Sequence, residues 1–204
     1  VDNLSNSSWD QLHSFIGPEK AKSVVFLEAN AADYNQLHNI FEKAKHHGEL
    51  NEVWHLAANS DIKSGVNNPV VDFENTFLTT YYTLELINKN INKKTKFIFT
   101  SSSAVFGDIK KNINEKTPAL YSCSNYGSFK LASEAIISSY SYLHNIKSYV
   151  FRLPNVVGKN LTHGVVFDLS NKIKNNDNSF LQVLGNGNQC KPYSYSSEIL
   201  DSIL

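Results

Sequence analysis

The sequence has little of several features that would point to particular classes of protein. It contains two cysteines, Cys123 and Cys190, which are too few for the disulfide framework of a small secreted domain. No apolar run is long enough to cross a membrane, and the first residues do not have the pattern of a signal peptide. Both absences favour a reducing compartment, and we expect a cytoplasmic protein.

An excess of one charge is also missing. Lys+Arg and Asp+Glu each number 19, so the formal net charge is zero and no overall field attracts nucleic acid or an anionic membrane. No group of His, Cys, Asp and Glu residues has the spacing of metal ligands. We therefore expect no metal, nucleic-acid or membrane binding, and an anionic ligand would be held by local dipoles or a few placed cations.

The sequence has no methionine and so lacks an initiator residue. Its 204 residues are enough for one domain with a proper core, or slightly more. We expect further sequence to precede these residues in the natural protein.

What is present is an alternation of short apolar runs with helix-length segments. The runs at residues 23–27, 52–56, 96–100 and 147–152 are typical of strands buried on both faces of a parallel sheet. Helices are predicted at 34–45, 70–88 and 126–145. The alternation predicts an α/β fold with a doubly wound parallel sheet. After residue 152 the rhythm weakens, so we expect one domain over 1–152 and a smaller lobe over 153–204.

In such folds, ligands bind at the carboxyl ends of the strands. Tyr126 and Lys130 stand four residues apart on a predicted helix, so their phenol and ammonium project from one face. An ammonium near a phenol favours the phenolate, which lowers the pKa of the tyrosine and suits it to proton transfer. The alternative is an ordinary exposed pair on a helix.

Three serines follow directly on the apolar run at 96–100. Ser102 could donate to a ligand oxygen there and relay a proton to Tyr126. The alternative is a serine-rich turn whose hydroxyls bond their own backbone.

The run at 52–56 also leads into candidate binding residues. Leu56, Ala57 and Ala58 would let a flat ligand approach the backbone, although tight packing of a helix on a strand explains small residues equally well. His55 is interpreted as a core histidine rather than a base or a metal ligand. At the start of the chain, Asp2 follows an apolar residue, as does the carboxylate that binds the adenosine ribose in dinucleotide-binding folds.

Several weak motifs occur together in a familiar order: VDNLS, HLAANSDI, DFENTFLTT, TSSSAVFG, YGSFK, RLPNVVG and GNGNQCKPYSY. In this order they resemble the extended short-chain dehydrogenase/reductase family, in particular the NAD-dependent epimerases and dehydratases of the UDP-glucose 4-epimerase group. The resemblance implies a Rossmann-like NAD-binding domain over 1–152 and part of a substrate-binding lobe over 153–204.

The resemblance also assigns roles. It makes Ser102, Tyr126 and Lys130 catalytic. It implies an NAD site made of Asp2, Asn3, Asn30, Ala31, Leu56, Ala57, Ala58, Asn75, Tyr126, Lys130 and Pro154. It implies a nucleotide-sugar site made of Ser102, Tyr126, Asn155 and Lys191. Relatives often form homodimers through the helices at 70–88 and 126–145, so a homodimer is expected here.

The sequence departs from the family pattern in several places. The first strand and the Gly-x-x-Gly-x-x-Gly loop, which holds the pyrophosphate at a helix N-terminus, are absent. Asn30 stands where an aspartate is usual, Lys191 where an arginine is common, and Phe129 where a small residue precedes the lysine. We therefore expect the sequence to be incomplete at both ends and inactive by itself.

The expected reaction is epimerisation of a UDP-hexose at C4 through a 4-keto intermediate. A dehydratase is less favoured, because such enzymes typically carry an Asp-Glu pair where Ser103 and Ala104 stand. A nucleotide-sugar reductase or decarboxylase stays open, as does a non-catalytic protein that binds a nucleotide or a partner on the same fold.

Overall fold

The computed structural model of the chain describes residues 1–59, 61–90, 95–109, 112–119, 121–159, 161–175, 180–183 and 185–204. The chain divides into two compact units, Val1–Phe151 and Arg152–Leu204. No helix in these ranges has both the length and the apolar character that crossing a membrane requires.

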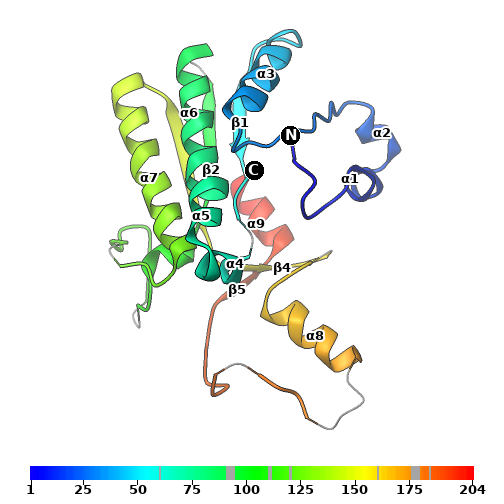
Figure 1. Cartoon of the computed structure of the whole chain (residues 1–204), viewed down its shortest axis with the longest axis vertical. Helices are drawn as coiled ribbons and strands as arrows, with labels where there is room; N and C mark the ends of the chain where they lie inside the picture. The colour runs from blue at the N-terminus through cyan, green and yellow to red at the C-terminus, as the bar shows by residue number, and fades with distance from the viewer. Residues whose placement is uncertain are drawn as a thin grey trace. The chain divides into compact units, whose positions relative to one another are not determined.

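A three-stranded sheet forms the centre of the first unit (Figure 1). It contains β1 (Glu52–His55), β2 (Lys96–Ser102) and β3 (Lys147–Leu153) in that order. β1 and β2 run parallel, with His55 opposite Phe99. The predicted strands at 52–56, 96–100 and 147–152 are therefore confirmed, and so is the α/β class with a parallel sheet.

The predicted strand at 23–27 is wrong. These residues have no regular secondary structure, and Val24 and Val25 are 42% and 60% exposed. A strand is stabilised by a ladder of hydrogen bonds along its partner. Here the pairing is limited to one parallel bridge between Asp2 and Glu28, so an apolar, β-branched run stays irregular.

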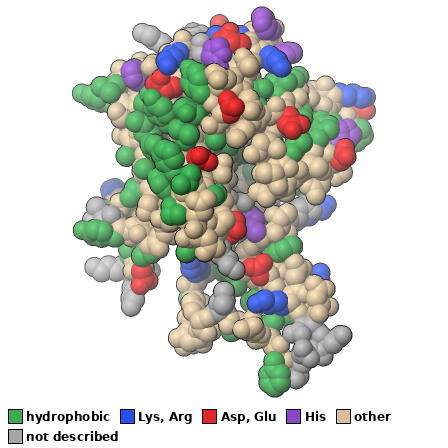
Figure 2. Space-filling model, viewed as in Figure 1, with side chains coloured by type: hydrophobic (Ala, Val, Ile, Leu, Met, Phe, Trp, Pro, Cys, Tyr) green, Lys and Arg blue, Asp and Glu red, His purple; other side chains and the backbone are tan. Residues whose placement is uncertain are grey.

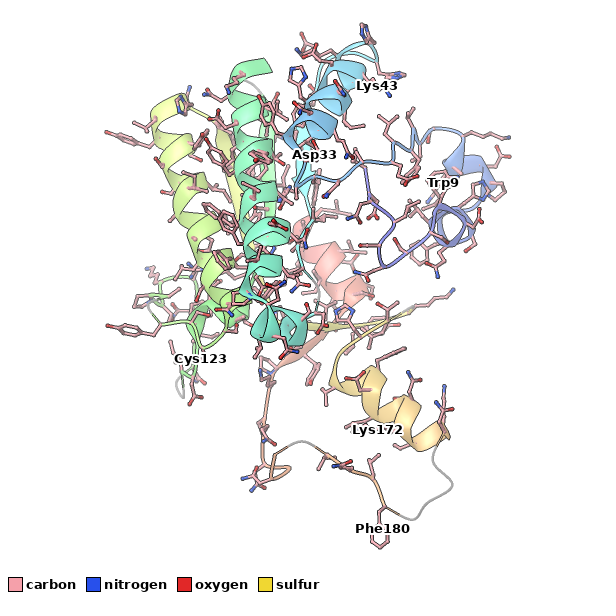
Figure 3. The ribbon with its side chains drawn as sticks, viewed as in Figure 1. Trp9, Asp33, Lys43, Cys123, Lys172 and Phe180 are labelled. Atoms are coloured by element: carbon pink, nitrogen blue, oxygen red, sulfur yellow. The ribbon has the colours of Figure 1, made fainter. Side chains whose placement is uncertain are left out.

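The helices of the first unit match the predicted segments closely. α3 (Tyr34–Lys45) begins at Asp33, labelled in Figure 3, whose carboxylate accepts from the backbone N–H groups of Asn35 and Gln36. α7 (Asn125–His144) is capped by Ser124 and ends at Asn145 in the left-handed region. The predicted helix at 70–88 is interrupted, because α5 (Pro69–Asp72) and α6 (Thr79–Asn90) are joined by the π-helical turn η1 (Phe73–Leu78).

Shorter elements complete the first unit. They are α1 (Trp9–Ile16), α2 (Pro18–Ala21), α4 (Ile62–Asn67) and the 3₁₀ turn η2 (Ser103–Phe106). Figure 2 shows apolar side chains gathered on the surface over the run from α5 to α6, where Val70 and Phe73 are 53% and 40% exposed.

The core lies between the sheet and the helices α3, α6 and α7. It is built from Leu37, Phe41, Leu84, Ile87, Phe97, Phe99, Ile137 and Tyr140. The expectation that the strands are buried on both faces holds for β2 but not for β1 and β3, where Trp54 and Val150 are 41% and 39% exposed. Side chains alternate along a strand, so Trp54 points away from the face on which its neighbour His55 meets α6.

In the described residues of the second unit there are a two-stranded parallel pair and two helices. β4 (Asn155–Val157) pairs with β5 (Tyr193–Tyr195), and α8 (Val165–Asn175) and α9 (Ser196–Ile203) accompany them.

Candidate active site

The three predicted catalytic residues lie on neighbouring segments of the first unit. Ser102 is the last residue of β2, and Tyr126 and Lys130 occupy the first turns of α7. The loop leading into α7 carries Cys123, labelled in Figure 3. The carboxyl end of β2 and the N-terminal end of α7 therefore form the candidate site, which we call the β2–α7 corner (Ser101–Gly107 and Ser124–Lys130).

A glycine lets the two segments of the corner approach closely. A Cβ added at Gly127 would lie 2.6 Å from the carbonyl oxygen of Ala104 and would overlap the hydroxyl of Ser122. Ala104 belongs to η2, two residues after Ser102. The absence of a side chain at Gly127 thus allows the first turn of α7 to pack against the turn that follows β2.

Tyr126 differs from its predicted electrostatic state. Burial raises the pKa of its phenol, the charge of Asp72 raises it further, and a side-chain hydrogen bond with Ser102 opposes both. The expectation that a nearby ammonium lowers the pKa of Tyr126 is therefore wrong for the chain as it stands. The reason is that the phenol is largely removed from water, which disfavours the phenolate.

Lys130 is buried, with 2% of its surface exposed, so the alternative of an exposed helix pair is also wrong. Its Nζ donates to the carbonyl oxygen of Thr100 at 2.6 Å and lies 4.5 Å from the centre of the Phe99 ring. The same Nζ is 5.8 Å from the centre of the Tyr126 ring. Burial lowers the pKa of Lys130 to about 8, against the opposing charge of Glu134.

Both interpretations of Ser102 have structural support. Its Oγ accepts from the backbone N–H of Ala104 at 3.2 Å, as in a serine-rich turn. The same side chain lies near enough to the Tyr126 phenol to lower the pKa of that phenol, as a relay would require. The turn therefore fixes the hydroxyl in a position from which it reaches Tyr126.

His55 is a core histidine, as interpreted from the sequence. It is 5% exposed and its ring stacks near Phe97 and Phe99. Its two ring nitrogens lie 3.3 Å from the hydroxyls of Thr79 and Thr83. Burial lowers the pKa of His55 to about 3, so the ring is neutral.

The segment after β1 presents an open apolar surface rather than a tightly packed one. Leu56 is 62% exposed, Ala57 is exposed and Ala58 is half-buried. The segment is tied to the π turn, because the backbone N–H of Asn59 donates to the hydroxyl of Thr76 at 3.2 Å. Its position after a parallel strand is where such sheets bind ligands.

The other residues expected to bind NAD in the first unit are engaged mainly in their own turns. Asp2 and Asn3 accept from backbone N–H groups two residues further on, and so does Asn30. Ala31 packs against the hydrophobic core. Asn75 is half-buried, and its carbonyl oxygen accepts from the hydroxyl of Thr79 at 3.1 Å.

The remaining predicted residues belong to the second unit. Pro154 stands between β3 and β4. The side chain of Asn155 donates to the carbonyl oxygen of Pro192 at 3.1 Å, and Lys191 is exposed. Their roles stay predictions.

Three residues near the corner were not predicted. The side-chain amide of Asn59 donates to the carboxylate of Asp72, and its backbone N–H donates to the hydroxyl of Thr76. Asp72 and Thr76 are fully buried. Asn59 lies within a motif that was recognised, and an acid within the apolar run PVVDF was a signal for Asp72. Thr76 carries no comparable signal.

A separate hollow lies beyond η2. It is a cavity of about 520 Å³ lined by Phe106, Asp108, Ile109, Asn112, Thr117, Pro118, Tyr121 and Cys123. It shares Phe106 with the corner, but its lining includes none of Ser102, Tyr126 and Lys130. Across the described part of the chain, no group of His, Cys, Asp and Glu residues could hold a metal ion.

A parallel α/β sheet with a hydroxyl, a phenol and a buried ammonium at one strand end defines a Rossmann-fold protein of the short-chain dehydrogenase/reductase class. The whole chain, residues 1–204, matches the family described as GDP-mannose 4,6 dehydratase. The chain belongs to this family, whose members are NAD-dependent epimerases and dehydratases of nucleotide sugars.

Individual relatives span several reactions. D-erythronate dehydrogenase of Haemophilus influenzae is 36% identical over 108 residues, which cover 53% of this chain and 34% of that protein. dTDP-D-glucose 4,6-dehydratase of Dictyostelium discoideum is 28% identical over 195 residues, which cover 90% of this chain and 43% of that protein. The crystal structure of a UDP-galactose 4-epimerase superposes with a TM-score of 0.78 at 27% identity, covering 99% of this chain and 60% of that one.

The chain thus spans less than half the length of each of these two curated relatives. The relatives fix the family and the fold, while the reaction and its substrate belong to the proposal that follows.

Proposed function

We propose that the chain carries the catalytic corner of an NAD-dependent nucleotide-sugar epimerase that interconverts UDP-hexoses at C4 through a 4-keto intermediate. The observation that supports this most directly is the placement of Ser102 at the end of β2 and of Tyr126 in the adjoining first turn of α7, with the buried Lys130 one turn further along. A non-catalytic binding protein would have no need of a buried lysine beneath a tyrosine.

Each of the three side chains has a chemical task in this proposal. Tyr126 accepts the proton of the sugar C4 hydroxyl and later returns it. Ser102, whose Oγ is fixed by the N–H of Ala104, orients the sugar oxygen against the phenol. Lys130 supplies positive charge at the base of the corner, and its contact with Thr100 holds its stem in place.

Two parts of the chain are suited to contact with NAD, namely the Lys130 ammonium and the segment that follows β1. The Lys130 ammonium has three N–H bonds, of which one is directed to Thr100, so others are available for ribose hydroxyls. The exposed apolar surface of Leu56 and Ala57 suits the flat face of a dinucleotide. When bound there, NAD would supply the hydride chemistry at the sugar carbon. Asp2, Asn3, Asn30, Ala31, Ala58, Asn75 and Pro154 complete the proposed NAD contacts.

The substrate and the setting are proposed on the same basis. Asn155 and Lys191 would bind the diphosphate of the nucleotide sugar. The complete protein would act in the cytoplasm as a homodimer, with the helices α5 to α7 at the interface. The apolar band over α5 and α6, in which Phe73 is 40% exposed, supports that choice of surface.

The test uses the complete protein with bound NAD and measures interconversion of UDP-glucose and UDP-galactose. Tyr126→Phe should reduce kcat by roughly 10²- to 10⁴-fold, as is usual for loss of a general acid or base. The matched control is Tyr121→Phe, because Tyr121 is 82% exposed and lies outside the corner. Turnover by Tyr126→Phe at the natural rate would disprove the proposed role.

A nucleotide-sugar dehydratase or reductase is the alternative within the family, and dehydratases are among the relatives. Against a dehydratase, the two positions after Ser102 carry Ser103 and Ala104, which offer no acid to expel water. Formation of a 4-keto-6-deoxy sugar nucleotide, in place of the C4 epimer, would establish the dehydratase.

A further inference from the structure

Asn59 joins two segments that the proposed NAD site takes from different parts of the chain. It directly follows residues 56–58, the apolar surface after β1, and its backbone N–H donates to the hydroxyl of Thr76 at 3.2 Å. Thr76 directly follows Asn75 on η1. This hydrogen bond therefore links the apolar surface to Asn75. Neither Asn59 nor Thr76 has a task in the proposed reaction itself.

The side chain of Asn59 is fixed by contacts of its own. Its amide nitrogen donates to Oδ1 of Asp72 at 2.7 Å and to the carbonyl oxygen of Asp61 at 2.8 Å. Its Oδ1 accepts from the backbone N–H of Asp61 at 3.0 Å. A side-chain amide has two N–H bonds, and here both have acceptors. The residue at the centre of the link is therefore held in one orientation.

Asp72 is a buried acid whose place in the core needs an explanation. It is the last residue of α5, and none of its surface is exposed. Its Oδ2 has no hydrogen-bond partner among the described residues and lies against Gly65 of α4, where an added side chain would overlap it. A buried oxygen without a donor is uncommon and costs free energy. Through its other oxygen Asp72 holds Asn59, which gives this acid a task.

The acceptor for Asn59 belongs to the π turn. Thr76 is fully buried, and its carbonyl oxygen accepts from the hydroxyls of Thr79 at 3.2 Å and Thr80 at 2.9 Å. Turns of this kind are rare and occur frequently at functional sites. In η1, a predicted NAD contact and the acceptor for Asn59 are consecutive residues, so whatever fixes Thr76 also fixes the backbone of Asn75.

We propose that Asn59 and Thr76 are positioning residues for the dinucleotide, which hold residues 56–58 and Asn75 at the spacing that NAD requires. The inference rests on the proposed NAD-dependent function, but it concerns binding of the cofactor rather than proton transfer at Tyr126. Loss of the link should therefore weaken cofactor binding and leave turnover of the loaded enzyme nearly as it was.

The experiment measures the affinity of the complete protein for NADH by fluorescence titration, together with kcat at saturating NAD. Thr76→Val keeps the shape of the side chain and removes the oxygen that accepts from Asn59. The Kd for NADH should rise by roughly fivefold to tenfold, as for the loss of one hydrogen bond, and kcat should change by less than about twofold. Thr76→Ser keeps the hydroxyl and should restore the natural affinity.

The matched control is Thr80→Val on α6. Thr80 is fully buried like Thr76, but its hydroxyl donates to a carbonyl oxygen of the same helical run. The control removes an equally buried hydroxyl without touching the bond to Asn59, so the Kd for NADH should stay at its natural value. A rise in Kd as large as that of Thr76→Val would indicate a general loss of packing and would overturn the inference.

An unchanged Kd for NADH in folded Thr76→Val, with Tyr126→Phe inactive, would overturn this inference alone. If Thr76→Val does not fold, as judged by circular dichroism, Asn59→Ala decides, because Asn59 is half-buried and the variant loses the contact with Asp72. A raised Kd in Asn59→Ala supports the inference, and a natural Kd overturns it. A complete natural protein that binds no NADH would overturn the proposed function and this inference with it.

Discussion

The β2–α7 corner and the first thirty residues are both expected to serve the same ligand, yet they are built in opposite ways. In the corner, residues distant in sequence are packed together, with Lys130 2% exposed and Gly127 against Ala104. Near the start of the chain, Asp2, Asn3 and Asn30 bond to backbone groups two residues away, and the neighbouring apolar run is irregular.

The difference shows that the proposed catalytic side chains depend on the fold more than the proposed ligand-binding side chains near the start of the chain do. The chemistry of Tyr126 and Lys130 is set by burial, which shifts the pKa of both side chains. The side chains of Asp2 and Asn30 bond within turns of a few adjacent residues, and one parallel bridge joins the backbone of Asp2 to Glu28. Substitutions in the corner should therefore affect stability strongly, whereas those in the first thirty residues should affect ligand binding alone.

The largest effect is expected from Lys130→Met. Because folding lowers the pKa of Lys130 from 10.5 to about 8, the unfolded chain binds more protons between these pH values. The stability of the natural chain should thus rise with pH through this window, by about 3 kcal/mol in all. Lys130→Met lacks this gain and should be at least as stable as the natural chain at pH 7. Urea unfolding at pH 7 and pH 9.5 measures the free energy of unfolding of the natural chain and of the variant. A strongly destabilised Lys130→Met at pH 7 would contradict the argument.

The packing of the corner is tested by Gly127→Val. A branched side chain there would meet the carbonyl oxygen of Ala104, and overpacking of this kind costs about 1–3 kcal/mol. The control is Ser128→Val, which places the same side chain at the next, exposed position of α7. Thermal unfolding should separate the two variants, and equal melting temperatures would show that the close approach is unimportant.

Acid sensitivity should arise behind the corner, at His55. Its pKa is about 3 in the folded chain, against 6.5 for an ordinary histidine in water, so stability is lost as the pH falls below 6.5. Between pH 6.5 and pH 5 the loss amounts to roughly 2 kcal/mol. His55→Gln should lose much less over the same range, whereas the exposed control His47→Gln should behave like the natural chain. Equal acid sensitivity of His55→Gln and the natural chain would rule out His55 as the source.

The smallest change in stability is expected from Asp2→Ala, below about 0.5 kcal/mol, as for most exposed positions. The same change in the complete protein should weaken NADH binding by roughly tenfold, because a hydrogen bond from a ribose hydroxyl to a charged group is lost. Fluorescence titration measures the affinity. A destabilisation as large as that of Gly127→Val would remove the contrast between the two regions.

Elements whose pattern is local were predicted well from the sequence. The helix at 34–45 carries its own cap at Asp33, and the strand before the serines is marked by a continuous apolar run. The prediction of a strand at 23–27 was wrong because a strand needs a partner segment long enough to pair with it. The apolar composition of the run says nothing about such a partner. The π turn was missed because apolar residues at helical spacing look alike in an α-helix and in a wider turn.

The sequence predicted that Ser102, Tyr126 and Lys130 lie together, but it did not predict their electrostatic states. Spacing alone placed Tyr126 and Lys130 on one helix face. The direction of the pKa shift of Tyr126 depends on burial and on Asp72, which is 54 residues away in sequence and acts through the fold. The same holds for Asn59 and Thr76, whose contacts join segments that only folding brings together.

The π turn η1 carries one more residue per turn than the helices on either side of it. Because the wider turn takes up one extra residue, loss of a single codon within Phe73–Leu78 would allow an ordinary α-helical turn to form there, with α5 and α6 facing the same way as before. Within α6 itself, each lost residue would rotate the flanking chain by about 100°. A gene-level deletion of three bases should therefore be tolerated better in η1 than in the helix that follows it.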